Sequence, residues 1–380
     1  MSPYETLLRR LTIGLRMTRQ TAPLTHTLCL THEETEILRT CRMEGNMQKL
    51  SPVLFAILIC VSIIAFAHAS MAQSSEASLP KKATRLVTLG TGGGPASRLE
   101  RAQSSNLLIV NGALYVVDAG PGIMDRLVRA RINFRDIDNL FITHAHDDHT
   151  GGLGELLTAQ YILNRTKPVN IYGPPGTETL VKALMQALTV TSDIRISDGT
   201  RTVPIAKIFF GHDTKIGVMY QDSNVKVTAA ENSHFHFPAG TPAYGKYRSY
   251  AYRFDTPDRV IVFTGDTGPS AAVTELAKGA DMLFSEVTTS IEEYKENQIR
   301  TGRWQTRTPE EQANSIRHMS EEHLTPEEVG KMAALAGVKT VVLTHLPPTA
   351  DPKDDYKRFG EQVKKHFSGQ VLIAKDLMEF

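Results

Sequence analysis

The residues best suited to chemistry lie close together in this 380-residue chain: His144, His146, Asp148 and His149. They follow residues 138–143, an apolar run that predicts a buried strand. Because side chains of an extended segment alternate in direction, the first two histidines point the same way. Asp148 and His149 come where the chain turns toward the next helix. A solvated polar loop could explain one histidine, but this cluster favours a site for two metal ions.

The N-terminal part carries the pattern of a secretory signal peptide at residues 47–69. A cationic start precedes an apolar run over residues 53–66, and Ala67 and Ala69 provide the small residues that a signal peptidase accepts. The pattern predicts export to the periplasm or the extracellular space. An uncleaved membrane anchor is the alternative, because the apolar run approaches the length of a spanning helix.

Cleavage at this point would limit the metal ligands that the mature chain can offer. Residues 1–46 show no sustained periodicity, so we expect them to be untranslated or disordered, and residues 70–82 are polar and typical of a linker. All three cysteines, Cys29, Cys41 and Cys60, precede the cleavage point. The mature chain then has neither disulfides nor thiolate ligands. Histidine and carboxylate ligands suit zinc, manganese or iron.

Residues 83–380 alternate between predicted strands and helices and are expected to form one domain. The predicted strands cover residues 85–90, 106–110, 113–117, 138–143, 169–172, 225–229, 250–254, 260–263, 282–285 and 340–343. The predicted helices cover residues 123–130, 153–163, 178–188, 271–277, 309–320 and 326–336. Asn111-Gly112 is a strong signal for a two-residue hairpin. Hairpins mixed with strand–helix alternation favour a layered α/β fold.

Four motifs within residues 83–380 resemble the metallo-β-lactamase superfamily: LGTGGGP, VVDAGPG, ITHAHDDHTGGLGELL and FTGDTGPS. The third motif contains the His-x-His-x-Asp-His signature of that superfamily. The chain is most similar to the branch that contains ribonuclease Z, related phosphodiesterases and arylsulfatase-like hydrolases. The resemblance implies a four-layer αββα sandwich. It also implies two divalent metal ions at one edge between the sheets, zinc in the first place and manganese or iron otherwise.

The metal ligands that the resemblance implies begin with the histidine cluster. His144 and His146 match ligands of the first ion, and Asp148 and His149 match ligands of the second. Asp266 follows the strand at residues 260–263 and matches the aspartate that bridges both ions. A carboxylate can do so because each of its oxygens can bind one cation.

Two further ligands come from the same resemblance. His345, after the strand at residues 340–343, matches the last ligand of the second ion. The remaining ligand of the first ion is expected at His234, which fits the family's spacing to the next strand better than His236. Asp118 matches an aspartate that does not bind the metal but orients a residue that does.

Glu286 and His323 match the pair in ribonuclease Z whose histidine protonates the leaving group. An alternative is that His323 only precedes a helix, because Thr325 and Glu328 form a capping-box pattern directly after it. With Asp148, this pair completes the expected catalytic residues.

Two cations can generate hydroxide at neutral pH from a water that they share, and can polarise the bond under attack. We therefore expect an exported hydrolase of phosphodiester or aryl sulfate ester bonds that uses a metal-bridging hydroxide. The alternatives are a ribonuclease Z-like endonuclease that processes tRNA 3′ ends, a lactonase, and a non-catalytic binding protein on the same scaffold.

Charge and spacing bear on the partners. The chain has 42 basic and 41 acidic residues, so it lacks the basic surplus typical of nucleic-acid-binding proteins. The stretch from His234 to Asp266 is also short for the tRNA-gripping arm of ribonuclease Z. We expect a small ester substrate rather than nucleic acid and no membrane contact after signal cleavage, and we leave a homodimer open.

Three segments are expected to shape the substrate pocket: residues 97–105, 235–250 and 288–308. The last contains Trp304 and several charges, and we expect it to act as a mobile lid. Three other histidines show no ligand-like context and are expected at the surface or in structural roles: His212, His318 and His366.

Overall fold

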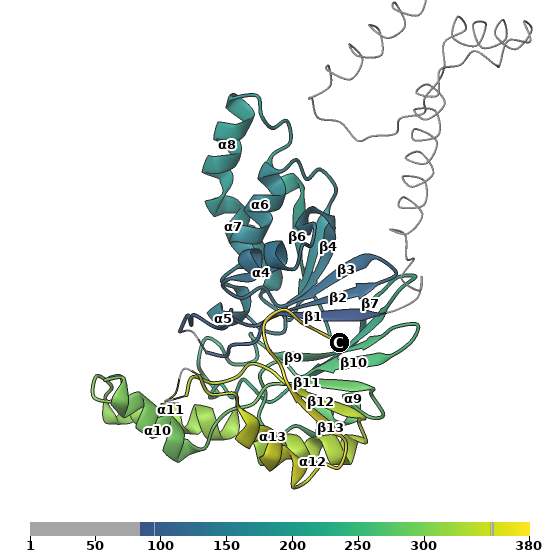
Figure 1. Ribbon diagram of the computed structural model, residues 1–380. Coiled ribbons are helices and arrows are strands. Elements are labelled where there is room, and N and C mark those ends of the chain that lie inside the picture. Colours follow the sequence, from purple (N-terminus) through teal and green to yellow (C-terminus); the bar gives the residue numbers. More distant parts are fainter. Residues whose placement is uncertain (1–83, 95, 350, 352) are drawn as a thin grey trace, which may run out of the picture. The chain divides into compact units, whose positions relative to one another are not determined.

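Two mixed β-sheets of seven strands each form the centre of the computed structural model (Figure 1). The structure describes residues 84–94, 96–349, 351 and 353–380. The first sheet has the order β14 (Met378–Glu379), β1 (Arg85–Gly90), β2 (Ser105–Val110), β3 (Ala113–Val117), β4 (Ile137–Phe141), β5 (Val169–Gly173) and β6 (Phe209–Asp213). The second has the order β13 (Gln370–Ile373), β12 (Thr340–Leu343), β11 (Met282–Ser285), β10 (Val260–Phe263), β9 (Tyr250–Asp255), β8 (Lys226–Glu231) and β7 (Gly217–Gln221).

Helices cover the outer face of each sheet. Over the first sheet lie α4 (Ile123–Arg129), α6 (Leu153–Ile162), α7 (Thr177–Ala187) and α8 (Thr189–Ser197). Over the second lie α9 (Ala271–Leu276), α12 (Pro326–Ala336) and α13 (Lys357–Lys364). The short α5 (Asp147–Thr150) follows β4, while α10 (Ile291–Arg300) and α11 (Pro309–Glu321) extend to one side of the sandwich (Figure 1). Two 3₁₀ turns cover Phe134–Asp136 and Ile205–Lys207.

Three separate hydrophobic cores hold the four layers together. One lies between the sheets and includes Leu108, Phe141 and Phe254. The other two lie between each sheet and its helices. Burial of apolar area in each contributes the main stabilising free energy of such a fold. The three cores confirm the predicted four-layer αββα sandwich.

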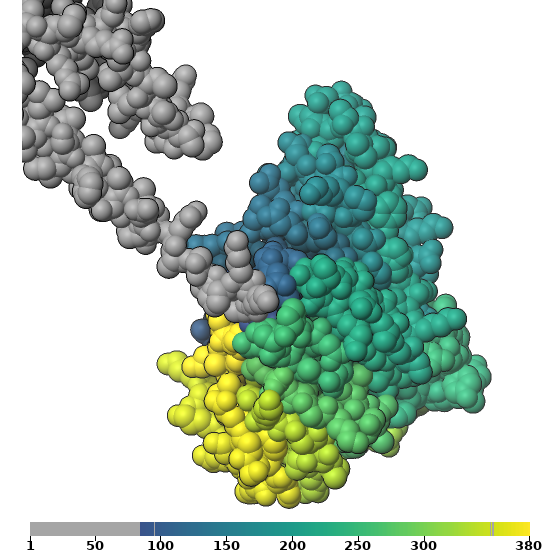
Figure 2. Space-filling view, turned by 90° about the vertical axis from the view of Figure 1, so that its right-hand side faces the viewer, coloured from purple at the N-terminus to yellow at the C-terminus, as the bar shows by residue number. Residues whose placement is uncertain are grey.

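The chain crosses from one sheet to the other near its middle. In Figure 2 the first half of the fold, in blue and teal, is stacked on the second half, in green and yellow. The C-terminal β14 returns to the first sheet, where it pairs with β1. Among the described residues, no helix combines the length and apolarity needed to cross a membrane. The predicted signal peptide lies outside the described residues.

Local sequence signals explain several element boundaries. Asn111 and Gly112 both have positive φ, as a type I′ hairpin turn between β2 and β3 requires. At the start of α12, Thr325 accepts a hydrogen bond from the Glu328 backbone, and the Glu328 side chain caps Thr325 in return. This is the capping box that the sequence predicts. It also fixes the loop that carries His323.

Candidate active site

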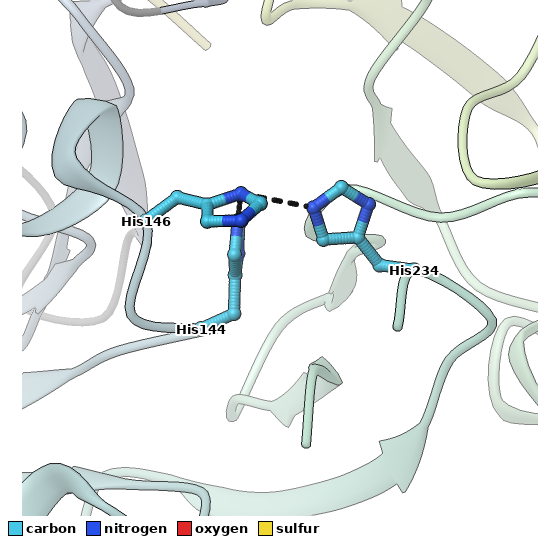
Figure 3. Close-up of side chains that lie close together, drawn as sticks. All are labelled: His144, His146 and His234. Atoms are coloured by element: carbon cyan, nitrogen blue, oxygen red, sulfur yellow. Dashed lines mark hydrogen bonds between the residues drawn. The ribbon is translucent and has the colours of Figure 1, made fainter. Parts of the chain in front are cut away.

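Three histidines from two loops converge on one point (Figure 3). His144 and His146 follow β4, and His234 follows β8 of the other sheet. Nδ1 of His146 lies 3.1 Å from Nε2 of His144 and 3.1 Å from Nε2 of His234. The single Nδ1 of His146 cannot form a full hydrogen bond with both of the other nitrogens. At least one nitrogen lone pair is therefore free, and the three rings together can hold a cation.

A second group of four buried side chains lies beside the first, and it consists of Asp148, His149, Asp266 and His345. Nε2 of His345 lies 3.1 Å from Oδ2 of Asp148 and 3.2 Å from Oδ2 of Asp266. Oδ1 of Asp266 lies 3.3 Å from Nε2 of His149. Asp148 and His149 lie in α5, whereas Asp266 follows β10 and His345 follows β12, so that almost two hundred positions separate the first of these residues from the last.

Asp266 lies between the two groups. Its Oδ2 is 3.9 Å from Nε2 of His144 and 4.0 Å from Nε2 of His234. Its Oδ1 faces His149 in the other group. Oδ2 thus lies within 4.0 Å of ligand nitrogens in both groups, and Oδ1 lies against the second group, so this one carboxylate borders both groups, as a bridging ligand must. The structure thus brings together all seven residues that the sequence analysis singles out as metal ligands.

His236, the alternative to His234, lies elsewhere. Its side chain is 46% exposed, and its nearest carboxylate is that of Glu322, 4.0 Å away. His234 is fully buried, and its Nδ1 donates to the backbone carbonyl of Glu322 at 3.0 Å. That bond directs Nε2 toward the other histidines.

Asp118 orients one of the imidazoles. Its Oδ2 lies 2.8 Å from Nδ1 of His149, and its Oδ1 accepts from the backbone N–H of Thr143 at 2.7 Å. Asp118 has φ of 62° directly after β3, which turns the chain toward the glycine loop. A carboxylate on the far nitrogen of a metal-binding histidine fixes the ring and raises its basicity.

The His345 ring lies so close to the backbone of the TGGG turn that Gly93 has no room for a side chain. A Cβ on Gly93 would lie 2.5 Å from Nδ1 of the His345 ring. The next residue, Gly94, donates its N–H to Oδ2 of Asp148 at 2.8 Å. This turn therefore holds both a ligand ring and a ligand carboxylate in place.

Burial and charge set the protonation states of the cluster. Burial and the neighbouring histidines hold the pKa of His144 well below its usual value, so that ring is neutral, as a metal ligand must be. Burial opposes ionisation of Asp266, but His345 and His149 lower its pKa well below the usual range. Burial likewise opposes protonation of His149, but Asp266, Asp118 and Asp148 raise its pKa. Metal binding at His149 would therefore release a proton.

Two buried atoms of the cluster have no hydrogen-bond partner in the described part of the chain, Nε2 of His149 and Oδ1 of Asp266. Buried polar atoms are nearly always paired, and exceptions call for an explanation. Divalent cations would satisfy both atoms. The donor set of histidine and carboxylate suits zinc, manganese or iron and fits two ions.

Glu286 and His323 form a pair on the edge of this cluster. Nδ1 of His323 lies 3.0 Å from Oε2 of Glu286. Oε1 of Glu286 accepts from the backbone N–H groups of Thr267 at 3.0 Å and Leu324 at 3.2 Å. Burial alone would lower the pKa of His323, but Glu286 first, and then Asp266 and Asp148, raise it to about 9. His323 is thus charged at neutral pH and able to give up a proton.

A cavity of about 350 Å³ opens from the cluster toward α10 and α11. His146, Asp148, Asp266 and His345 line it at one end. Of the three segments predicted to shape the pocket, residues 288–308 line this cavity, whereas no residue of 97–105 or 235–250 is in its wall. The predicted lid segment contains a regular helix, α10, which the sequence analysis did not expect.

His318 has no ligand-like context in the sequence and is expected at the surface or in a structural role, and the structure adds that it lines the cavity. Its Nε2 lies 3.2 Å from Nε2 of His323. Nδ1 of His318 bonds Glu322 at 2.7 Å. Spacing could have suggested the residue, because His318 and Glu322 are four positions apart and share one helix face.

Comparison with known proteins agrees with this geometry. A family model described as a β-lactamase superfamily domain matches residues 114–346, more than half of the chain. The chain belongs to the metallo-β-lactamase superfamily, and it is a metal-dependent hydrolase by family.

Its curated relatives place it near one branch of that superfamily. Ribonuclease Z from Mycobacterium sp. (strain KMS) is 32% identical over 298 residues, which cover 77% of this chain and 94% of the relative. Ribonuclease Z from Mycolicibacterium gilvum is 28% identical with the same coverage. These relatives match the branch that the motifs indicate.

Solved structures show the same fold. The metallo-β-lactamase fold protein YhfI from Bacillus subtilis superposes with a TM-score of 0.55 and 19% identity, covering 78% of this chain and 98% of that protein. The short form of human tRNase Z gives a TM-score of 0.52 and 21% identity, covering 78% and 98%. A diphosphatase of the PhnP family gives 0.52 and 17%, covering 78% and 97%.

Proposed function

We propose that this protein is a phosphodiesterase that uses two divalent metal ions, most readily zinc. The observation that carries the proposal is the convergence of seven histidine and aspartate side chains, with the carboxylate of Asp266 next to both ligand groups. The ribonuclease Z relatives support a phosphodiester substrate over a sulfate ester.

In this proposal, His144, His146 and His234 would hold one ion, Asp148, His149 and His345 would hold the other, and Asp266 would contribute to both sites. When bound, two such ions supply a nucleophile from water at neutral pH and stabilise negative charge that develops on the substrate.

The chain's own residues supply the proton for the leaving group. Glu286 keeps His323 protonated, and two backbone N–H groups hold the Glu286 carboxylate in place. His323 lines the cavity, where it can donate its Nε2 proton to the departing oxygen. His318 lies against that nitrogen and can receive or return the proton between turnovers.

The substrate in this proposal is a small diester rather than tRNA. Between β8 and β9, residues 232–249 contain no helix or strand. The arm that ribonuclease Z is expected to carry in this stretch therefore has no counterpart here. The tRNA 3′-processing reaction is the competing function, because the curated relatives are ribonuclease Z enzymes.

Export is part of the proposal, based on the signal-peptide pattern at residues 47–69. N-terminal sequencing of the protein isolated from its own cells would test it. A mature terminus near residue 70 is expected. A terminus that retains residues 47–69 in the soluble fraction would contradict export through a cleaved signal.

The direct test compares substrates on metal-loaded protein. We expect hydrolysis of bis(4-nitrophenyl) phosphate that disappears on chelation and returns with zinc or manganese, with slower cleavage of 4-nitrophenyl sulfate and of a tRNA precursor. His234→Ala should lose metal and activity, whereas His236→Ala, two positions away and outside the ligand group, should retain both. Cleavage of the tRNA precursor at a higher kcat/KM than any small diester would favour the competing function.

A further inference from the structure

The far end of the active-site cavity is formed by the hairpin of α10 and α11, and it carries positive charge. Arg303 and Arg307, from the turn between the two helices, line the same cavity as the metal-ligand cluster. The cavity volume of about 350 Å³ is within the range of small-molecule sites. A substrate with its reacting bond at the cluster can therefore extend toward these arginines.

Arg307 is half-buried and has only neutral partners. Its Nη1 donates to the hydroxyl of Tyr294 at 3.1 Å and to that of Ser315 at 2.7 Å. In the described part of the chain, neither Arg303 nor Arg307 forms a salt bridge, although the nearby Arg358 pairs with both Glu293 and Asp354.

An arginine in a cavity wall without a carboxylate partner has donors to spare. The guanidinium group carries five N–H donors in a planar fork, and that fork matches the two oxygens of a carboxylate or phosphate. The bonds to Tyr294 and Ser315 use one of its three nitrogens. The others remain available to a ligand.

The hairpin that carries these arginines is anchored to the body of the protein. Glu293 of α10 accepts two hydrogen bonds from Arg358, at 2.7 and 2.9 Å. The side-chain amide of Asn297 donates to the carbonyl of Pro348 at 3.2 Å. The arginines therefore stand at a defined place relative to the cluster.

We propose that Arg303 and Arg307 form an anion subsite. The subsite selects phosphodiesters in which the alcohol that stays on the phosphorus carries a second negatively charged group, a carboxylate or a phosphate. This deepens the proposed function and rests on it, since it assigns the substrate class to the same cavity. Tyr294 and Ser315 position Arg307 for this contact.

Three matched 4-nitrophenyl phosphodiesters test the subsite. Their second alcohols end in a methyl group, a carboxylate or a phosphate monoester. With metal-loaded wild-type protein we expect a higher kcat/KM for one or both anionic diesters than for the methyl one. Arg307→Gln should lower kcat/KM for the preferred anionic diester about tenfold to a hundredfold, mainly through KM. The methyl diester should lose much less, so that the preference for the anionic diester falls.

Two further variants separate charge recognition from support of the hairpin. Arg300→Gln removes the same charge from the same hairpin at a residue outside the cavity wall, and it should leave the anionic preference intact. Arg307→Lys keeps the charge and should restore part of the preference. An equal loss with all three diesters in Arg307→Gln, or no preference in the wild type, would overturn the subsite.

A binding measurement distinguishes failure of the subsite from failure of the hydrolase. Trp304, the single tryptophan of the chain, lies in the turn that carries both arginines. Its fluorescence should change on titration of the full-length protein with inorganic phosphate, and Arg303→Gln/Arg307→Gln should abolish the change. If no diester is hydrolysed but this change is seen, the hydrolase fails and the subsite stands. An identical change in the double variant would reject the subsite.

Discussion

The metal-ligand cluster and the α10–α11 hairpin face the same cavity but are built in opposite ways. Six of the seven ligand side chains are buried, and they lie at the ends of strands from both sheets. In the hairpin, α11 has no buried residue and α10 has one, Gln298. The strands that end at the cluster pack into the three hydrophobic cores, whereas a few polar contacts anchor the hairpin.

This difference suggests a division of work. Reacting groups need positions fixed to within a fraction of an ångström, which strand ends over a packed core can provide. Groups that select a substrate tolerate more variation and can lie on an appended element. Substitutions in the cluster should therefore affect all substrates alike, and substitutions in the hairpin should change the ranking of substrates.

Asp266→Asn should have the largest effect. The amide keeps the size of the side chain but removes the charge and one acceptor that the two ligand groups share. We expect loss of bound metal and a fall in kcat/KM of roughly a thousandfold or more with every diester. Metal content by mass spectrometry, with circular dichroism as the folding control, measures this. Full metal occupancy with normal turnover would remove the basis for the two-metal proposal.

His323→Ala should reduce turnover while metal content stays normal. Its Nε2 proton is needed most when the leaving oxygen is a poor leaving group. We expect about a hundredfold loss of kcat for an alkyl leaving group and a smaller loss for 4-nitrophenolate. His212→Ala is the control, because His212 stacks on Tyr172 and does not line the cavity. An equal loss for both leaving groups would argue against proton donation.

Asp118→Asn tests how far metal binding depends on a residue that contacts a ligand but not the metal. Asp118 bonds Nδ1 of His149 but does not reach the shared centre itself. Substitution of such a partner typically lowers metal affinity about tenfold to a hundredfold. We expect that loss in competition with a chelator, while kcat at saturating metal changes less. Unchanged affinity would show that packing alone orients His149.

The same contrast explains what could be predicted from the sequence. Each ligand follows an apolar strand, and apolar runs such as those of β4 and β12 are strong local signals. The motifs then indicated which strand ends meet. The choice of His234 over His236 depended on spacing alone, and the structure places only His234 in the ligand group.

Three of the missed elements, β6, β7 and α10, lack such signals. β6 and β7 are edge strands with exposed apolar residues, Phe210 and Val218 among them, so no clean alternation marks them. Helix α10 is polar on most of its surface and has a single buried residue. His318 was missed because its contact with His323 depends on how the chain turns between α11 and α12, which no residue pattern marks.

Asp222→Asn should have the smallest effect and should touch stability alone. Asp222 accepts hydrogen bonds from Tyr115 at 2.6 Å and Tyr220 at 2.9 Å, so it joins β3 of one sheet to β7 of the other. It also accepts from the backbone N–H of Asn224 and Val225. Partial burial would raise its pKa, but these bonds outweigh burial and lower it.

The sign of the pH dependence follows from that lowered pKa. The contribution of Asp222 is fully present above the unfolded-state pKa, about 3.9, and is lost as the pH falls through the lower folded-state pKa. We expect Asp222→Asn to cost about 1 kcal/mol of unfolding free energy near pH 7, because exposure to water weakens the bonds. In urea unfolding, the difference from wild type should shrink below about pH 4, and kcat/KM at pH 7 should not change. A change in diester hydrolysis would mean that this remote edge of the sandwich is coupled to the metal-ligand cluster.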